Sequence, residues 1–150
     1  MLFSEKAREI IDTQKPVDKS IFCRVKKALA AKDVIIQQSE ELDAWLISKG
    51  VEAITFSDGS TMIMHTKVSA SGFFEEIIHY GQIKGGRAAW GDRENILLME
   101  IEAKEKLIKY YKAYQITDYE VEVLTNVLNY HKVELEELRG GGGCVQDDGR

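Results

Sequence analysis

The feature that most constrains the fold of this chain is the pair Asp58-Gly59 between two short runs of alternating apolar residues. The runs span residues 51–56 and 61–65. Asp-Gly in this setting is a strong signal for a β-hairpin, because both residues tolerate the positive φ angles of a tight turn. Segments with helical spacing of apolar residues lie before and after the hairpin, so the sequence predicts an α+β fold.

Helices are predicted where apolar residues recur every three to four positions. Six segments share this spacing, and they span residues 4–13, 20–32, 39–50, 73–82, 93–115 and 117–138. Ser20, Ser39 and Thr117 are the expected N-caps, and Glu120 completes a capping box with Thr117. Val34-Ile35-Ile36 is a further β-prone run, so we expect a small sheet of three strands beside the helices.

Length and composition indicate one compact domain. The chain has 150 residues, of which 44% are hydrophobic, and this is enough to form a core of its own. We predict a single domain over residues 1–139, in which residues 1–20 form an N-terminal extension. Glycine fills positions 140–143, so residues 140–150 are predicted to be a flexible, glycine-rich tail.

Charge and hydropathy exclude several classes of partner. The net charge is −5, which predicts poor affinity for nucleic acid and therefore no nucleic-acid partner. The sequence has no run of about 18 apolar residues, so no membrane span is expected. The first six residues lack the apolar stretch of a secretory signal, which favours a cytoplasmic protein.

The candidate site begins in the helix predicted over residues 73–82. Glu75, His79 and Gln82 fall on one stripe of this helix, at the spacing i, i+4 and i+7, and Glu76 lies at its edge. The pattern is a partial match to His-Glu-x-x-His, in which two histidines bind zinc and the glutamate activates water. Glu75 stands at the position of the first histidine. Gln82 is expected either to support His79 or to lie on the surface.

A second acidic residue is expected from the helix over residues 93–115. A helical wheel places Glu100 in the middle of the apolar face of this helix, and Glu102 on the opposite side. A buried carboxylate needs a cation, a metal or a hydrogen-bond network to offset its desolvation. Two interpretations follow: Glu100 joins His79 at a metal site, or it pairs with a basic side chain, for which the candidates are Lys84, Arg87 and Arg93. Glu102 is the alternative ligand if the helix has another phase.

Residues 50–138 resemble zincin-like metallopeptidase domains found in bacterial polymorphic toxins. The resemblance is carried by residues 71–79 (Ser-Gly-Phe-Phe-Glu-Glu-Ile-Ile-His), 98–109 and 113–118, and by the closing helix to Glu137. It implies a zincin-like fold that is mostly helical, with a small three-stranded sheet over the active-site helix. It also implies that Glu76 is the general base and that His79, Glu100 and Glu75 bind the metal. One imidazole with carboxylates suits Zn²⁺, and also Mn²⁺ or Fe²⁺.

The resemblance further implies a function and partners. The function is that of a metal-dependent peptidase that acts as a toxin effector on protein or peptide substrates. A cognate immunity protein is the implied partner, and delivery as part of a larger toxin would need no classical signal peptide. A carboxylate at position 75 lowers the net charge of the metal and weakens its effect on bound water. The alternative is therefore a catalytically inactive zincin-like binding or structural module that holds no metal.

The sequence has two further histidines. His65 ends the second strand of the hairpin, and His131 lies on the last predicted helix. The sequence places both on the surface, outside the predicted ligand set.

Overall fold

The computed structural model describes residues 14–87 and 92–144, and the predicted helix over residues 4–13 lies outside these ranges. The described residues form five helices and three strands, which confirms the α+β class. Their bounds are α2 (Lys19–Ala30), β1 (Ile35–Gln37), α3 (Glu40–Lys49), β2 (Ala53–Thr55), β3 (Thr61–Met64), α4 (Ala70–Lys84), α5 (Arg93–Lys109) and α6 (Asp118–Cys144).

The three strands form one mixed sheet in the order β1-β3-β2. The predicted hairpin is confirmed: β2 and β3 are antiparallel, and Ile54 lies opposite Ile63. Strand β1 adds to the other edge of β3 in parallel, with Ile36 opposite Met62. Gly59 in the turn has a φ of 73°, a conformation that favours glycine. The sheet therefore leaves β2 as one of its two edges.

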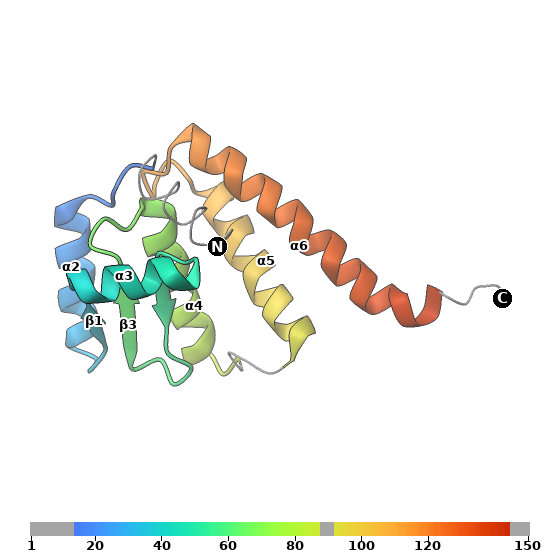
Figure 1. Ribbon diagram of the computed structural model, residues 1–150, viewed down its shortest axis with the longest axis horizontal. Helices are drawn as coiled ribbons and strands as arrows, with labels where there is room; N and C mark the ends of the chain where they lie inside the picture. The colour runs from blue at the N-terminus through green and yellow to red at the C-terminus, as the bar shows by residue number, and fades with distance from the viewer. Residues whose placement is uncertain (1–13, 88–91, 145–150) are drawn as a thin grey trace.

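Helices cover both faces of the sheet (Figure 1). Helix α3 crosses one face, while α2 and α4 lie against the other. The core on the α2–α4 side is built around Phe73, Met62 and Met64, each fully buried. Ser69, just before α4, is the N-cap of that helix and accepts a hydrogen bond from the N–H of Gly72. This arrangement confirms a three-stranded sheet packed on the helix that carries Glu75 and His79.

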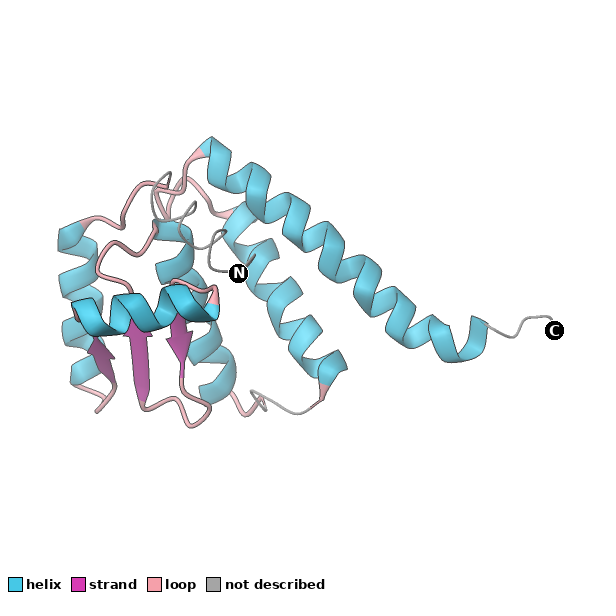
Figure 2. Cartoon of the chain, viewed as in Figure 1, coloured by secondary structure: helices cyan, strands magenta, loops and turns pink. Residues whose placement is uncertain are grey.

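Helices α5 and α6 pack side by side as a second layer, and α6 extends beyond the rest of the molecule (Figure 2). They are antiparallel, because Arg93 at the start of α5 pairs with Glu134 late in α6, and Glu105 pairs with Lys132. Apolar side chains such as Leu97 and Leu128 fill the seam between them. Helix α5 also packs against α4, so the face of α5 that carries Glu100 meets the face of α4 that carries Glu75 and His79.

Several predicted helix bounds differ from the structure, in which α4, for example, spans Ala70–Lys84 rather than residues 73–82. Asp18, rather than Ser20, caps α2, because its carboxylate accepts the N–H groups of Ser20 and Ile21. Helix α5 ends at Lys109 rather than at residue 115, because the chain turns over residues 110–115 and Gln115 adopts a φ of 59°. Tyr111 and Tyr114 continue the helical spacing of apolar residues, but they lie in this turn. From there they pack against a core cluster that includes Leu107 and Ile116.

A further difference concerns the glycine-rich segment. Helix α6 runs to Cys144 and so includes residues 140–144, which the sequence placed in a flexible tail, and residues 145–150 of that tail lie outside the described residues. Glycine ends a helix most readily when it takes a left-handed conformation, and the described glycines with positive φ are Gly50, Gly59 and Gly86. Gly140 is not one of them, so nothing in its backbone stops the helix. The capping box at the other end is confirmed by mutual hydrogen bonds between Thr117 and Glu120.

Glu52 lies beneath the first turn of α4 and ties it to the strand β2. One carboxylate oxygen accepts the N–H of Ser69 at 2.8 Å and the other accepts its hydroxyl at 2.8 Å. Burial raises the pKa of Glu52 from 4.5 to about 7, and the charges of Glu75 and Glu120 add to this, against the two hydrogen bonds. The folded chain therefore holds a proton on Glu52 at a pH where the unfolded chain has released it.

We expect Glu52→Gln to stabilise the protein at pH 8 and to have little effect at pH 4.5. The folded state binds more protons than the unfolded state between pH 4.5 and about 7, so stability falls as the pH rises through that window. The glutamine keeps a hydrogen-bond acceptor for Ser69 and does not titrate, so the variant should gain about 1–3 kcal/mol at pH 8. Urea unfolding at both pH values measures this. Glu136→Gln, at an exposed position of α6, is the control and should show no such difference.

Candidate metal centre

Three side chains that the sequence predicted as ligands come together between α4 and α5. One potential ligand atom from each of Glu75, His79 and Glu100 lies within 4.8 Å of the others. The Nε2 atom of His79 is 3.0 Å from Oε2 of Glu100 and 3.5 Å from Oε2 of Glu75. Ligands held about 2.1 Å from one tetrahedral ion are about 3.4 Å apart, so the two distances from Nε2 are close to the spacing of ligands around one ion.

Gln82 fixes the orientation of the His79 ring. Its side-chain N–H donates to the backbone carbonyl of Met99 at 3.1 Å, which leaves its Oε1 atom toward the ring. That oxygen is 2.8 Å from Nδ1 of His79, so Nδ1 must be the donor. Nε2 then points toward Glu75 and Glu100. Gln82 is therefore the hydrogen-bond partner of His79, which is the first of the two alternatives that the sequence left open.

In this orientation, Nε2 can interact with the two carboxylates in either of two states. Either it carries a proton, so that His79 is an imidazolium, or its lone pair binds a cation. In the protonated form burial lowers the pKa of His79, but hydrogen bonds to Glu100 and Glu75 outweigh this and raise it to about 11. Burial raises the pKa of Glu100, but His79 and Lys104 outweigh this effect and hold the pKa far below its usual range. The two carboxylates therefore favour a positive charge at the position of Nε2.

Lys104 is the main residue that the sequence analysis missed. Its side chain is 7% exposed, and its Nζ atom lies 2.7 Å from Glu100 and 2.9 Å from Glu75. These two carboxylates raise its pKa although burial alone would lower it. The ion pair that the sequence offered as an alternative for Glu100 therefore exists, but its partner is Lys104 instead of Lys84, Arg87 or Arg93. The i, i+4 spacing of Glu100 and Lys104 on one helix is the signal that could have revealed it.

Glu76 lies beside the three candidate ligands without belonging to their cluster. Its Oε1 atom accepts a hydrogen bond of 2.6 Å from the hydroxyl of Thr55 on the edge strand. Burial raises the pKa of Glu76 from 4.5 to about 7, opposed by the charge of His79 and by the bond from Thr55. A carboxylate with a pKa near neutrality next to a candidate metal position has the properties of a general base.

These side chains line a cavity of about 260 Å³. Strand β2 forms one wall through Ala53, Ile54 and Thr55, and Met99 and Ile96 of α5 form another. The polar groups Glu75, Glu76, His79 and Glu100 line the same space. A largely apolar cavity with a few convergent titratable groups is the usual form of a small-molecule or active site.

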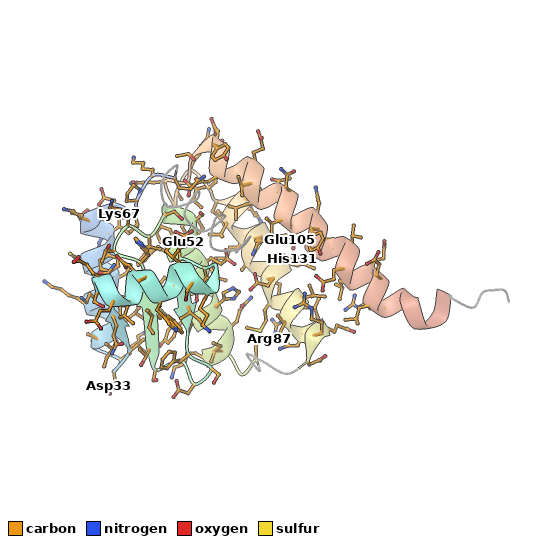
Figure 3. The ribbon with its side chains drawn as sticks, viewed as in Figure 1. Asp33, Glu52, Lys67, Arg87, Glu105 and His131 are labelled. Carbon is orange, nitrogen blue, oxygen red and sulfur yellow. The ribbon has the colours of Figure 1, made fainter. Side chains whose placement is uncertain are left out.

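The alternative ligand Glu102 is excluded by its position. Its side chain is half exposed, and Oε1 accepts a charged hydrogen bond of 2.8 Å from Arg87, which is labelled in Figure 3. The helical wheel therefore had the correct phase: Glu100 faces α4 and Glu102 faces away from the cluster. The expectation that Glu100 is buried holds in part, because its side chain is 28% exposed.

Both remaining histidines differ from their predicted surface positions. His65 is 8% exposed, its Nδ1 accepts the N–H of Lys67, and its Nε2 lies 3.7 Å from Asp43 of α3. His131 projects from α6 toward α5 (Figure 3), and its Nε2 atom is 4.0 Å from Oε1 of Glu100. Burial and the charge of Lys104 lower the pKa of His131. It thus lies at the border of the cluster, brought there by tertiary packing alone.

None of the described helices is long and apolar enough to cross a membrane. The chain matches no family model, no curated protein and no solved structure.

Proposed function

We propose that this protein is a metal-dependent hydrolase whose centre is formed by Glu75, His79 and Glu100. The observation that carries the proposal is the orientation of His79: Gln82 holds the proton on Nδ1 and turns Nε2 toward two carboxylates. Histidines that bind metals are typically fixed in this way through their other nitrogen. The donor set of one imidazole and two carboxylates fits Zn²⁺, and also Mn²⁺ or Fe²⁺.

The roles of the residues follow from their places around the cavity. A divalent metal at this centre would polarise a scissile carbonyl group and acidify a water molecule. Glu76 is the group that accepts the proton of the attacking water, because its carboxylate borders the ligands and has a pKa near neutrality. Thr55 holds one oxygen of Glu76 in place through a hydrogen bond. Lys104 offsets the charge of Glu75 and Glu100 from the side of α5.

The substrate class and biological setting come from the resemblance to zincin-like toxin domains. On that basis we propose that the substrate is a peptide bond in a protein or peptide. We also propose that the chain acts as a toxin effector, neutralised by a cognate immunity protein. It would act in the cytoplasm or be delivered as part of a larger toxin.

A second candidate function is a metal-free binding module, and Lys104 is the observation that favours it. With His79 protonated, the charges of Glu75, Glu100, His79 and Lys104 sum to zero, and every charged group has a partner of opposite sign. Buried charges that are paired in this way need no further cation. The two candidate functions differ in whether Nε2 of His79 binds a proton or a metal.

Metal content separates the two functions. Elemental analysis of the purified protein after incubation with Zn²⁺, Mn²⁺ or Fe²⁺ at neutral pH should find about one tightly bound ion per chain. His79→Ala should lose this ion, and Glu102→Ala should keep it, because Glu102 faces away from the cluster on the same helix as Glu100. Wild-type protein that binds none of the three metals would overturn the hydrolase proposal and favour the binding module.

Gln82→Leu is expected to weaken metal binding by about 10- to 100-fold. The leucine cannot accept a hydrogen bond from the Nδ1–H group, so the ring is free to turn Nε2 away from Glu75 and Glu100. Titration with Zn²⁺ against a competing chelator measures the change. Gln82→Glu restores an acceptor for Nδ1 and should recover most of the affinity. Equal affinities in wild type and Gln82→Leu would show that Gln82 does not orient the ligand.

A further inference from the structure

A second cavity, of about 140 Å³, lies where the first turn of α4 meets α5 and α6. Its polar wall includes the carboxylates of Glu52, Glu75 and Glu120, and its apolar wall includes Val123 and Val127 of α6. Glu75 also lines the first cavity, but the other acidic groups belong to this one alone. The proposed hydrolase chemistry uses neither Glu52 nor Glu120.

An unpaired acceptor is part of this wall. Gln14 is 7% exposed, it lines the cavity, and its Oε1 atom has no hydrogen-bond partner among the residues that the structure describes. Buried polar atoms in folded proteins nearly always have a partner, from the protein or from a bound molecule. The partner missing here has to be a donor, because an amide oxygen only accepts hydrogen bonds.

The cavity is also short of positive charge. Lys104 is the one basic residue among its described lining residues, and its ammonium group is engaged by Glu75 and Glu100. Glu52 and Glu120 receive hydrogen bonds from Ser69, Ser71 and Thr117, which are all neutral donors. Burial, and then the charges of Glu75 and Glu120, raise the pKa of Glu52 against the hydrogen bonds from Ser69.

We propose that this second cavity binds a small organic cation, a primary alkylammonium ion. Its ammonium group donates to Oε1 of Gln14 and to the carboxylates of Glu52 and Glu120, and its short apolar tail lies against Val123 and Val127. A bare metal ion fits less well, because a space of about 140 Å³ with an apolar wall is larger than one ion needs. This site is separate from the proposed metal centre, although the two share Glu75.

The test uses n-propylammonium chloride as the probe and isothermal titration calorimetry as the measurement. Propan-1-ol has the same tail without the charge, and sodium chloride at equal ionic strength controls for screening. We expect saturable binding of n-propylammonium with a dissociation constant on the order of 1 mM, the range open to so small a ligand. Propan-1-ol should give no saturable binding. Equal binding of alcohol and amine, or no saturation by the amine well above that concentration, would overturn the proposal.

Variants place the binding in the cavity. Glu52→Gln and Gln14→Leu should each weaken n-propylammonium binding at least tenfold, and Val127→Phe should abolish it by filling the space. Glu122→Gln, at an exposed position on α6, is the matched control and should bind as wild type does. The proposed contacts of the ammonium ion involve neither His79 nor a metal, so a failure of the metal proposal leaves this result intact. Unchanged affinity in Glu52→Gln and Val127→Phe, with thermal unfolding confirming that both are folded, would exclude the cavity.

Discussion

Lys104→Met is expected to lower the free energy of unfolding by about 3–5 kcal/mol, because it removes one partner from a buried ionic cluster. The methionine fills nearly the same volume, so the loss is electrostatic rather than a cavity effect. Glu75 and Glu100 would then face each other with only His79 between them, and desolvated carboxylates without a partner are strongly unfavourable. Urea unfolding at neutral pH, in the absence of metal, measures the difference.

The control for this experiment is Lys106→Met, at an exposed position two residues further along α5. Its effect should stay within about 0.5 kcal/mol, the usual range for surface substitutions. A loss in Lys104→Met no larger than that of the control would show that Lys104 contributes little and would weaken the case for a closed ionic cluster.

The same variant reports on the metal proposal. If a divalent ion binds Glu75, His79 and Glu100, adding it should restore much of the stability that Lys104→Met loses, because it supplies the missing positive charge. At a metal concentration about 100 times the dissociation constant, binding to the folded state alone contributes about 2.7 kcal/mol. Stability that does not respond to metal would favour the metal-free module.

The sequence predicted those parts of the fold and the site that depend on local pattern. The hairpin follows from Asp58-Gly59, because Gly59 adopts the positive φ that the turn requires. The approach of Glu75 and His79 follows from their i, i+4 spacing, and the inward direction of Glu100 follows from the apolar residues around it. Each of these features is encoded within a few residues, so one sequence is enough to reveal it.

Features that depend on packing between distant segments were not predictable in this way. The hydrogen bond from Thr55 to Glu76 and the approach of His131 to Glu100 join residues that are 21 and 31 positions apart. No local pattern indicates either contact. The end of α5 was missed for a different reason: Tyr111 and Tyr114 continue the apolar period, but the turn at Gln115 places them in the core without a helix. Periodicity reports burial, and it identifies a helix only when the backbone agrees.

Under the proposed peptidase function, Glu76→Gln is expected to reduce peptide hydrolysis in the presence of metal about 10²- to 10⁴-fold, the usual contribution of a general base. The glutamine cannot accept the proton of the attacking water, although it can still accept the hydrogen bond from Thr55. Hydrolysis of fluorescently labelled casein gives the rate, and elemental analysis of the same samples gives the metal content. Because Glu76 lies outside the ligand cluster, the variant should keep its metal, and this separates loss of the base from loss of the centre.

Glu105→Gln, on the exposed side of α5, is the control and should hydrolyse casein at the wild-type rate. If Glu76→Gln keeps both its metal and its activity, another group takes the proton, and His131, whose Nε2 atom lies 4.0 Å from Glu100, is the next residue to replace.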